Sequence, residues 1–208
     1  MIKSVLITGT GGGLGKELVS VFSICGWNVM EHKGRVQGNL NNPETIERLR
    51  YFAEAYDIDL LINNAGVYTN KTLSEMSIGK YWEVMETNLL APIALTKAIW
   101  PIFQKKKKGM VIFINSMAGI VGSRGESAYC ASKFGLKGFA DSLQFEGVKE
   151  NIRVLSFYFG AMKTGMRWGS PDYEKFIDPA EAAKTVLEFC QSKPSSRITS
   201  IEIKRNLY

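Results

Sequence analysis

Short, continuous apolar runs separated by helical patterns constrain the fold of this chain more than any other feature. The runs are Ser4–Thr8, Trp27–Glu31, Arg35–Gly38, Asp59–Asn63, Met110–Asn115, Arg153–Tyr158 and Arg197–Ile203. Continuous rather than alternating hydrophobicity is typical of strands that are buried on both faces. Helical patterns fill most of the gaps, at Gly13–Cys25, Pro43–Tyr56, Gly79–Lys106, Ser127–Lys149 and Pro179–Gln191. This succession predicts a doubly wound α/β fold of the Rossmann type, with helices on both faces of a parallel sheet of about seven strands.

One connection departs from this alternation. Only a few residues separate Trp27–Glu31 from Arg35–Gly38, too few for a crossover helix, so we expect a shortened connection between the second and third strands. Asn42 and Asp178 each precede a proline and are expected to cap the helices that follow. The 208 residues contain no internal repeat and no linker rich in glycine, serine and proline, which predicts one domain over residues 1–208.

Charge and cysteine content argue against several classes of protein. Much of the net charge of +6 comes from the run Lys105–Lys108, which is typical of a solvated helix end, so no nucleic-acid partner is expected. Three widely spaced cysteines form no CxxC pair and predict neither a disulfide framework nor a metal site. No signal peptide and no apolar run long enough to cross a bilayer is found, so we expect a cytoplasmic protein without a membrane partner.

A glycine-rich turn follows the first expected strand and opens the first expected helix. It reads TGTGGGLG over Thr8–Gly15. Glycines let the backbone approach a pyrophosphate closely, and the start of a helix offers free N–H groups and the positive end of its dipole. The alternative is a flexible glycine loop without a ligand. The candidate phosphate-binding residues are Thr8, Gly9, Gly11, Gly13, Leu14 and Gly15.

A tyrosine, a lysine and a serine form a second candidate constellation. Tyr129 and Lys133 are four residues apart at the start of an expected helix, so their side chains share one face. A nearby ammonium favours the phenolate and would lower the pKa of the tyrosine, which can then exchange a proton with a carbonyl oxygen. Ser116 follows an expected strand at the carboxyl edge of the sheet, where its hydroxyl can hold the same oxygen. A YxxxK pair alone is usually a surface pair, and only the coincidence with the glycine turn gives it weight.

With these motifs in chain order, the sequence resembles a classical-type short-chain dehydrogenase/reductase. The resemblance rests on TGxxxGxG at Thr8–Gly15, NNAG at Asn63–Gly66, Asn88 in a helix, Ser116, and YxxxK at Tyr129 and Lys133. It extends from the first strand to about Thr164. It implies an NAD(P)-dependent oxidoreductase that transfers hydride between the dinucleotide and a small carbonyl or alcohol substrate.

The resemblance also implies roles for individual residues. Tyr129 would be the acid/base, Lys133 would bind the nicotinamide ribose and lower the tyrosine pKa, and Ser116 would orient the carbonyl. Asn88 would anchor a water on a proton path, or alternatively bond backbone across a helix kink. The further positions implied for the cofactor are Asn39, Leu40, Asn64, Ala65, Gly66, Gly160 and Thr164, in addition to Tyr129 and Lys133. Two departures from the family pattern are Phe159 in place of a proline and Asn39 in place of an aspartate.

Residues after the second strand bear on the choice of cofactor. The position at which the family carries an acidic residue in NAD-dependent members is occupied here by Lys33, with His32 and Arg35 beside it. Lysine and arginine would pair with the 2′-phosphate of NADP(H), so NADP(H) is favoured over NAD(H). Two alternatives stay open, since Glu31 is close enough to take the acidic role and loop charges are often merely solvated.

Segment 165–178 is the expected substrate lid, and it is short. Its apolar residues Met166, Trp168, Tyr173 and Phe176 would cover the substrate or, alternatively, dock on the protein body. The long helices expected at Gly79–Lys106 and Ser127–Lys149 carry more apolar residues than one sheet-facing stripe needs, which predicts a homodimer or homotetramer. The rival interpretation of the whole chain is a dinucleotide-binding sensor or regulatory module without turnover.

Overall fold

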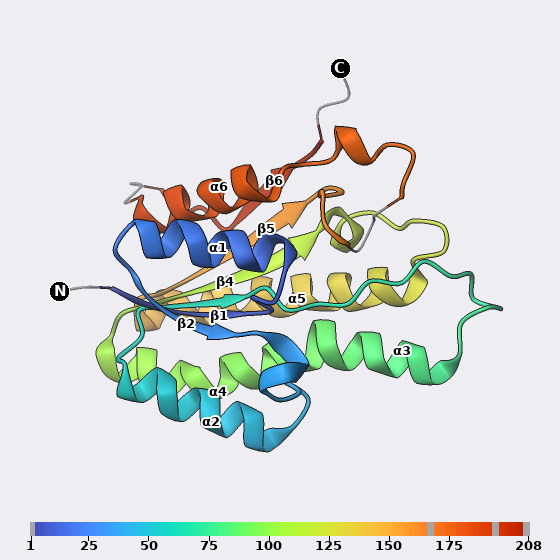
Figure 1. Ribbon diagram of the computed structural model, residues 1–208. Helices are drawn as coiled ribbons and strands as arrows, with labels where there is room; N and C mark the ends of the chain where they lie inside the picture. Colours follow the sequence, from blue (N-terminus) through green and yellow to red (C-terminus); the bar gives the residue numbers. More distant parts are fainter. Residues whose placement is uncertain (1–2, 166–168, 193–195, 206–208) are drawn as a thin grey trace.

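The computed structural model describes residues 3–165, 169–192 and 196–205, and its centre is one parallel sheet (Figure 1). The strands run in the order β2-β1-β3-β4-β5-β6. Their bounds are β1 Ser4–Thr8, β2 Asn28–His32, β3 Leu60–Asn63, β4 Gly109–Ser116, β5 Ile152–Phe159 and β6 Ser200–Ile203. All five pairings between neighbouring strands are parallel, which confirms the Rossmann-type α/β fold expected from the sequence.

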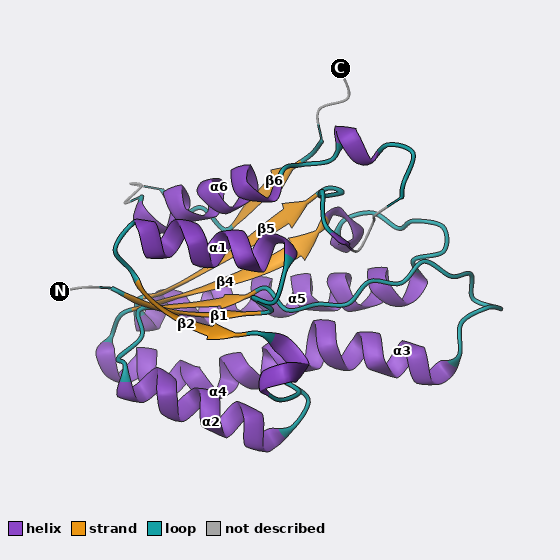
Figure 2. Cartoon of the chain, in the orientation of Figure 1, coloured by secondary structure: helices purple, strands orange, loops and turns teal. Residues whose placement is uncertain are grey.

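Helices cover both faces of this sheet (Figure 2). One face carries α1 (Gly13–Ile24) and α6 (Pro179–Gln191), and the other carries α2 (Pro43–Ala55), α4 (Ala91–Lys106) and α5 (Ser127–Glu150). The remaining helical elements are α3 (Ile78–Met85), a π-helical turn η2 (Glu86–Leu90), and the short 3-10 turns η1 (Gly34–Gln37), η3 (Met117–Gly119) and η5 (Tyr173–Lys175).

The apolar core is divided by the sheet into two layers. Leu18 and Phe22 of α1 pack with Val186 of α6 against one face. Leu95 of α4 and Leu136 of α5 belong to the cluster on the other face. Both faces of the central strands are therefore buried, which explains why their sequences are continuously apolar rather than alternating.

The expected strand at Arg35–Gly38 is wrong. Residues 34–37 form the 3-10 turn η1, and Val36 is 91% exposed, so its side chain has no core to pack against. Gly34 (φ 81°) and Gly38 (φ 110°) flank the turn in left-handed conformations that do not continue a strand. The expected shortened connection between the second and third strands is wrong as well, because η1 leads into α2, which forms a helical crossover from β2 to β3. The sheet therefore has six strands, and β2 lies at its edge.

The helix expected over Gly79–Lys106 is interrupted. It consists of α3, the π-turn η2 and α4, and Asn88 lies in the π-turn. A π-turn inserts an extra residue per turn and often marks a functional position in a helix. The two expected helix caps are confirmed, because the Asn42 side chain accepts from Glu44 N and the Asp178 side chain accepts from Ala180 N.

Candidate active site

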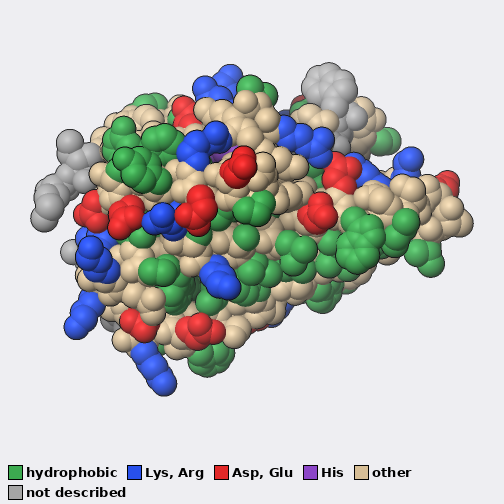
Figure 3. Space-filling view, turned by 90° about the horizontal axis from the view of Figure 1, so that it is seen from below, with side chains coloured by type: hydrophobic (Ala, Val, Ile, Leu, Met, Phe, Trp, Pro, Cys, Tyr) green, Lys and Arg blue, Asp and Glu red, His purple; other side chains and the backbone are tan. Residues whose placement is uncertain are grey.

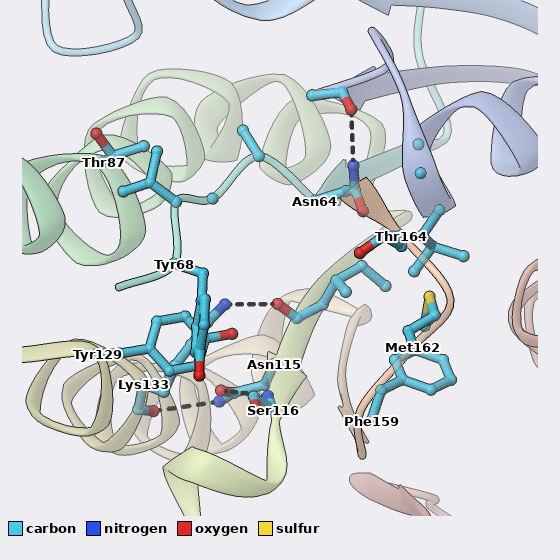
Figure 4. Close-up of a pocket in the computed structure, with 18 of the residues that line it drawn as sticks. Asn64, Tyr68, Thr87, Asn115, Ser116, Tyr129, Lys133, Phe159, Met162 and Thr164 are labelled. Carbon is cyan, nitrogen blue, oxygen red and sulfur yellow. Dashed lines mark hydrogen bonds between the residues drawn. The ribbon is translucent and has the colours of Figure 1, made fainter. Parts of the chain in front are cut away.

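A cavity of about 770 Å³ opens at the carboxyl ends of the strands (Figure 4). Its wall combines the glycine turn after β1, the end of β2, the β3–α3 loop, the end of β4, the first turns of α5 and the segment after β5. Nearly all site residues expected from the sequence line it, namely Gly9, Gly11, Gly13, Leu14, Gly15, Lys33, Arg35, Asn39, Leu40, Asn64, Ala65, Gly66, Ser116, Tyr129, Lys133, Gly160 and Thr164. Thr8 and Asn88 lie behind the wall instead.

The glycine turn forms a close-fitting cradle. Gly9 has a φ of 71°, and a Cβ there would lie 2.6 Å from the Cα of Ala65. A Cβ on Gly15 would overlap the backbone oxygen of Gly9. The N-cap of α1, Gly12, provides no side-chain hydrogen bond, so the first N–H groups of the helix are left for a ligand. Such a cradle suits the pyrophosphate of a dinucleotide, and the residues present fit that group.

Thr8 and Asn64 fasten this turn to β3. The Thr8 hydroxyl oxygen accepts hydrogen bonds from Asn64 N and Ala65 N, both at 3.1 Å. In return, the Asn64 side-chain amide donates to Thr8 O at 2.9 Å. The side chain of Thr8, 1% exposed, therefore positions the cavity wall from behind.

Charged residues surround the cavity at the end of β2. Lys33 and Arg35 line it, whereas Glu31 does not. Arg35 Nη2 lies 2.7 Å from the Glu83 carboxylate on α3, and Lys33 Nζ lies 4.0 Å from Glu31. The His32 ring is buried, with Nε2 2.9 Å from Gly38 O, and burial lowers its pKa. Of the three basic groups anticipated here, His32 is therefore buried with a lowered pKa, whereas Lys33 and Arg35 are exposed at the cavity.

Tyr129, Lys133 and Ser116 meet on one side of the cavity (Figure 4). Lys133 Nζ lies 5.8 Å from the centre of the Tyr129 ring and donates to Ile114 O at 3.0 Å. Burial lowers the pKa of Lys133 to about 8. Burial also raises the pKa of Tyr129 to about 12, although the Ser116 hydroxyl acts in the opposite direction.

The expected lowering of the Tyr129 pKa by Lys133 is therefore not found in this structure. The ammonium is bonded to a backbone oxygen rather than to the phenol, and removal of the phenolate from water outweighs the favourable contacts. The phenol carries its proton at neutral pH, which is the form that donates to a carbonyl oxygen.

Two asparagines hold this constellation in place. The Asn88 side chain accepts from Val67 N at 2.8 Å, donates to Val67 O at 2.9 Å, and reaches the Ser132 hydroxyl at 3.2 Å. Asn88 thus bonds the backbone of the β3–α3 loop, and not backbone across the kink of its own helix, as the alternative interpretation expected. Asn115 accepts from Ser116 N at 2.8 Å and donates to Lys133 O at 3.3 Å.

Sequence reasoning missed Asn115 and Glu126 as site residues. Both line the cavity, and Glu126 is 7% exposed. Asn115 stands directly before Ser116 at the end of β4, and Glu126 lies one helical turn before Tyr129. Their places beside Ser116 and Tyr129 were the only signals that the sequence offered for Asn115 and Glu126, because each of these two side chains has a hydrogen-bond partner that is distant in sequence.

The segment expected as a lid is described in part. Met166, Arg167 and Trp168 lie outside the described residues. Tyr173 and Phe176 are in ring contact at 5.8 Å, and Phe176 is 5% exposed. Phe176 therefore docks on the protein body, whereas Gly165, at the start of the segment, lines the cavity.

Other kinds of site are not found among residues 3–165, 169–192 and 196–205. No cluster of three or more His, Cys, Asp or Glu side chains there could hold a metal ion. Within the same residues, no helix has both the length and the apolar character needed to cross a membrane.

The sheet order, the glycine cradle and the cavity at the strand ends define a Rossmann-type dinucleotide-binding protein. The family model for short chain dehydrogenases matches residues 35–175. The chain belongs to the short-chain dehydrogenase/reductase family of NAD(P)-dependent enzymes.

Individual relatives agree with this assignment. The 3-oxoacyl-(acyl-carrier-protein) reductase FabG of Buchnera aphidicola subsp. Schizaphis graminum is 31% identical in an alignment of 234 positions, gaps included, that covers 98% of this chain and 96% of that protein. The peroxisomal hydratase-dehydrogenase-epimerase of Saccharomyces cerevisiae is 30% identical over 73% of this chain, which spans only 19% of that longer protein.

Solved structures share the fold over nearly the whole chain. ElxO with NADP bound superposes with a TM-score of 0.86 at 19% identity, covering 98% of both chains. A 4-hydroxyisoleucine dehydrogenase complexed with NADH superposes with a TM-score of 0.85 at 25% identity, covering 98% of this chain and 97% of the other.

Proposed function

We propose that this enzyme interconverts a small carbonyl compound and its alcohol, with Tyr129 as the acid/base. The observation that carries the proposal is the meeting of Tyr129, Ser116 and Lys133 in the cavity that also contains the glycine cradle. One ligand lying along this cavity would contact both groups of residues. The nicotinamide cofactor supplies or accepts the hydride when it is bound.

The chain's own residues handle the substrate oxygen and its proton. Ser116 ends β4 with its hydroxyl facing the cavity and orients the carbonyl oxygen (Figure 4). The protonated Tyr129 hydroxyl donates to this oxygen in reduction and must first lose its proton in oxidation. The buried Lys133 ammonium would bind ribose hydroxyls of the cofactor, because its remaining donors are not used by Ile114 O.

Other residues that line the cavity would each bind a different part of the cofactor. The glycine turn would hold the pyrophosphate, and Gly160 and Thr164 on the segment after β5 would bind the nicotinamide amide. The residues that would hold the adenosine half are Asn39, Leu40, Asn64, Ala65 and Gly66. Gly165, at the start of the segment expected as a lid, would border the substrate end of the cavity.

NADP(H) is the preferred cofactor in this proposal. Lys33 and Arg35 line the cavity at the end of β2, and the nearest acid, Glu31, does not. A 2′-phosphate placed there would form charge-assisted hydrogen bonds with these residues. The Glu83 carboxylate competes for Arg35, so part of the binding energy would be used to separate that ion pair.

The enzyme is proposed to act as a homodimer or homotetramer in a reducing compartment such as the cytoplasm. Exposed apolar side chains on α3–α5 support the assembly, including Trp82, Leu90, Phe134, Phe145 and Val148. The three cysteines are free thiols, which is in keeping with a reducing compartment.

The rival function is a dinucleotide sensor without turnover. The activities of wild type and of one variant distinguish the two functions. Tyr129→Phe keeps the ring and its packing, so it should fold and bind NADPH while the rate of NADPH oxidation with a panel of aldehydes and ketones falls by about 10²–10⁴ or more. Retention of most of the wild-type rate would refute the role of Tyr129. Wild-type binding of NADPH without turnover on the whole panel would favour the sensor.

A further inference from the structure

Tyr68, on the loop between β3 and α3, packs directly against Tyr129. The two ring centres lie 5.2 Å apart with an interplanar angle of 83°, an edge-to-face contact. Figure 4 shows the two rings side by side, with Ser116 and Lys133 next to them. Because edge-to-face pairs have a preferred geometry, the Tyr68 ring restricts the orientation of the Tyr129 ring.

Glu126 in turn holds Tyr68. The Tyr68 hydroxyl donates to Glu126 Oε1 at 2.7 Å, and the Asn70 side-chain amide donates to the Tyr68 hydroxyl at 3.3 Å. Glu126 is 7% exposed and precedes α5, three residues before Tyr129. The carboxylate that fixes Tyr68 is therefore attached to the same helix start that carries Tyr129.

The backbone around this contact is joined as well. Lys71 N donates to Gly125 O at 2.7 Å. Gly125 has a φ of 77°, and a Cβ there would overlap the Asn70 side-chain oxygen. The loop of residues 68–71 and the segment that leads into α5 are thus joined by backbone as well as side-chain contacts. The hydrogen bond between Tyr68 and Glu126 therefore lies within a packed region.

We propose that Tyr68 and Glu126 form a positioning pair, in which the Glu126 carboxylate holds the Tyr68 ring, this ring orients Tyr129, and the carboxylate three residues before Tyr129 suits the site to carbonyl reduction. This inference rests on the acid/base role of Tyr129 in the proposed function. The pair itself transfers no proton and acts only through Tyr129.

The electrostatic surroundings of Tyr129 support this role. The groups facing it are Ser116 at the end of β4, Tyr68 on its loop, and Glu126, Cys130 and Lys133 on or just before α5. Glu126 and Tyr68 act to raise the pKa of Tyr129, in the same direction as burial, and Ser116 acts to lower it. A negative charge beside a phenol disfavours the phenolate. Alcohol oxidation, which needs the phenolate, should accordingly rise only at alkaline pH.

Glu126→Gln tests the electrostatic half of the proposal. The glutamine oxygen still accepts from the Tyr68 hydroxyl, but the negative charge is gone. The ascending limb of the plot of kcat/KM against pH for alcohol oxidation should move to lower pH, by about half a unit to one unit. The exposed carboxylate Glu188 on α6 provides the control, and Glu188→Gln should leave the limb in place. A limb that stays in place in folded Glu126→Gln overturns the electrostatic role.

Substitutions of Tyr68 test the positioning half. Tyr68→Phe removes the hydroxyl and its bonds to Glu126 and Asn70 but keeps the ring, whereas Tyr68→Leu also removes the ring contact. Tyr68→Leu should lower kcat for reduction more than Tyr68→Phe does, while the NADPH dissociation constant measured by fluorescence stays near the wild-type value. Equal kcat in wild type and both variants overturns the positioning role. If Tyr129→Phe remains active, the proposed function fails instead, so the two failures are distinguishable.

Discussion

The Nζ atom of Lys133 lies 3.0 Å from the backbone oxygen of Ile114, inside a helix–strand contact where Lys133 is 5% exposed. No carboxylate among the described residues forms an ion pair with it. The charge is stabilised by one carbonyl dipole and is otherwise removed from water, which is why burial lowers its pKa to about 8. Because burial of this charge is unfavourable in free energy, we infer that the ammonium has a function, and cofactor binding is the function proposed above.

The stability of the cofactor-free protein should therefore depend on pH through Lys133. Between pH 8 and about 10.5 the unfolded chain holds a proton on this lysine that the folded protein has released, so the free energy of unfolding rises with pH in that window. The total gain is about 3 kcal/mol. Urea unfolding of wild type and Lys133→Met at pH 7, 9 and 10 measures it, since the other groups are common to both proteins. Parallel pH dependences in the two proteins would contradict the buried, charged lysine.

Two glycines of the turn after β1, Gly12 and Gly15, should respond differently to substitution by alanine. Gly15→Ala forces a methyl group against Gly9 O and the Asn64 side chain, so it should destabilise the fold by about 1–3 kcal/mol. Gly12 has extended backbone and no heavy atom within 4 Å of an added Cβ, so Gly12→Ala should leave the melting temperature unchanged. The same methyl group would stand at the open start of α1, and NADPH binding should weaken. If Gly12→Ala binds NADPH as wild type does, the phosphate does not lie against this turn.

Glu83 provides a sharp test of the NADP(H) preference. Glu83→Gln releases Arg35 from its ion pair and should increase affinity for NADPH without changing affinity for NADH. The double variant Lys33→Ala/Arg35→Ala should do the reverse and lower NADPH affinity by about tenfold or more, since a hydrogen bond to a charged group contributes about 1.5–3 kcal/mol. Fluorescence titration of wild type and both variants with NADPH and with NADH gives the six dissociation constants to be compared. Equal effects on NADPH and NADH would mean that these residues do not bind the phosphate.

Local motifs were sufficient to predict the strands, the cradle and the meeting of Ser116, Tyr129 and Lys133. Each motif combines a backbone requirement with a chemical group, and parallel strands bring such groups to one edge of the sheet. The strand expected at Arg35–Gly38 failed for a physical reason. The segment contains a β-branched residue typical of strands, Val36, but this valine is exposed and lies between two left-handed glycines, so it has no partner to pack against.

Features that depend on distant partners could not be predicted. The Tyr68–Glu126 hydrogen bond joins residues 58 apart, and the Arg35–Glu83 ion pair joins residues 48 apart. The high pKa of Tyr129 likewise depends on burial by several elements, whereas the spacing of Tyr129 and Lys133 alone suggested the opposite shift. Spacing identifies which groups share a helix face, but the surrounding structure decides how charged they are.

Exposed apolar side chains on α3–α5 lead to the last prediction, which concerns assembly. Trp82 is 60% exposed and Phe145 is 72% exposed, and Figure 3, which views the molecule from below, shows hydrophobic side chains gathered in the region of α3. Because exposed apolar patches are typical of protein–protein contacts, we expect this surface to contact a second copy of the chain related by a two-fold axis. Phe145→Glu should shift the mass measured by light scattering toward the monomer. Tyr51→Glu on α2, a control with a similarly exposed ring outside the expected contact, should leave the mass unchanged. A wild-type protein that is monomeric at micromolar concentration would exclude this assembly, and those side chains would then need another partner.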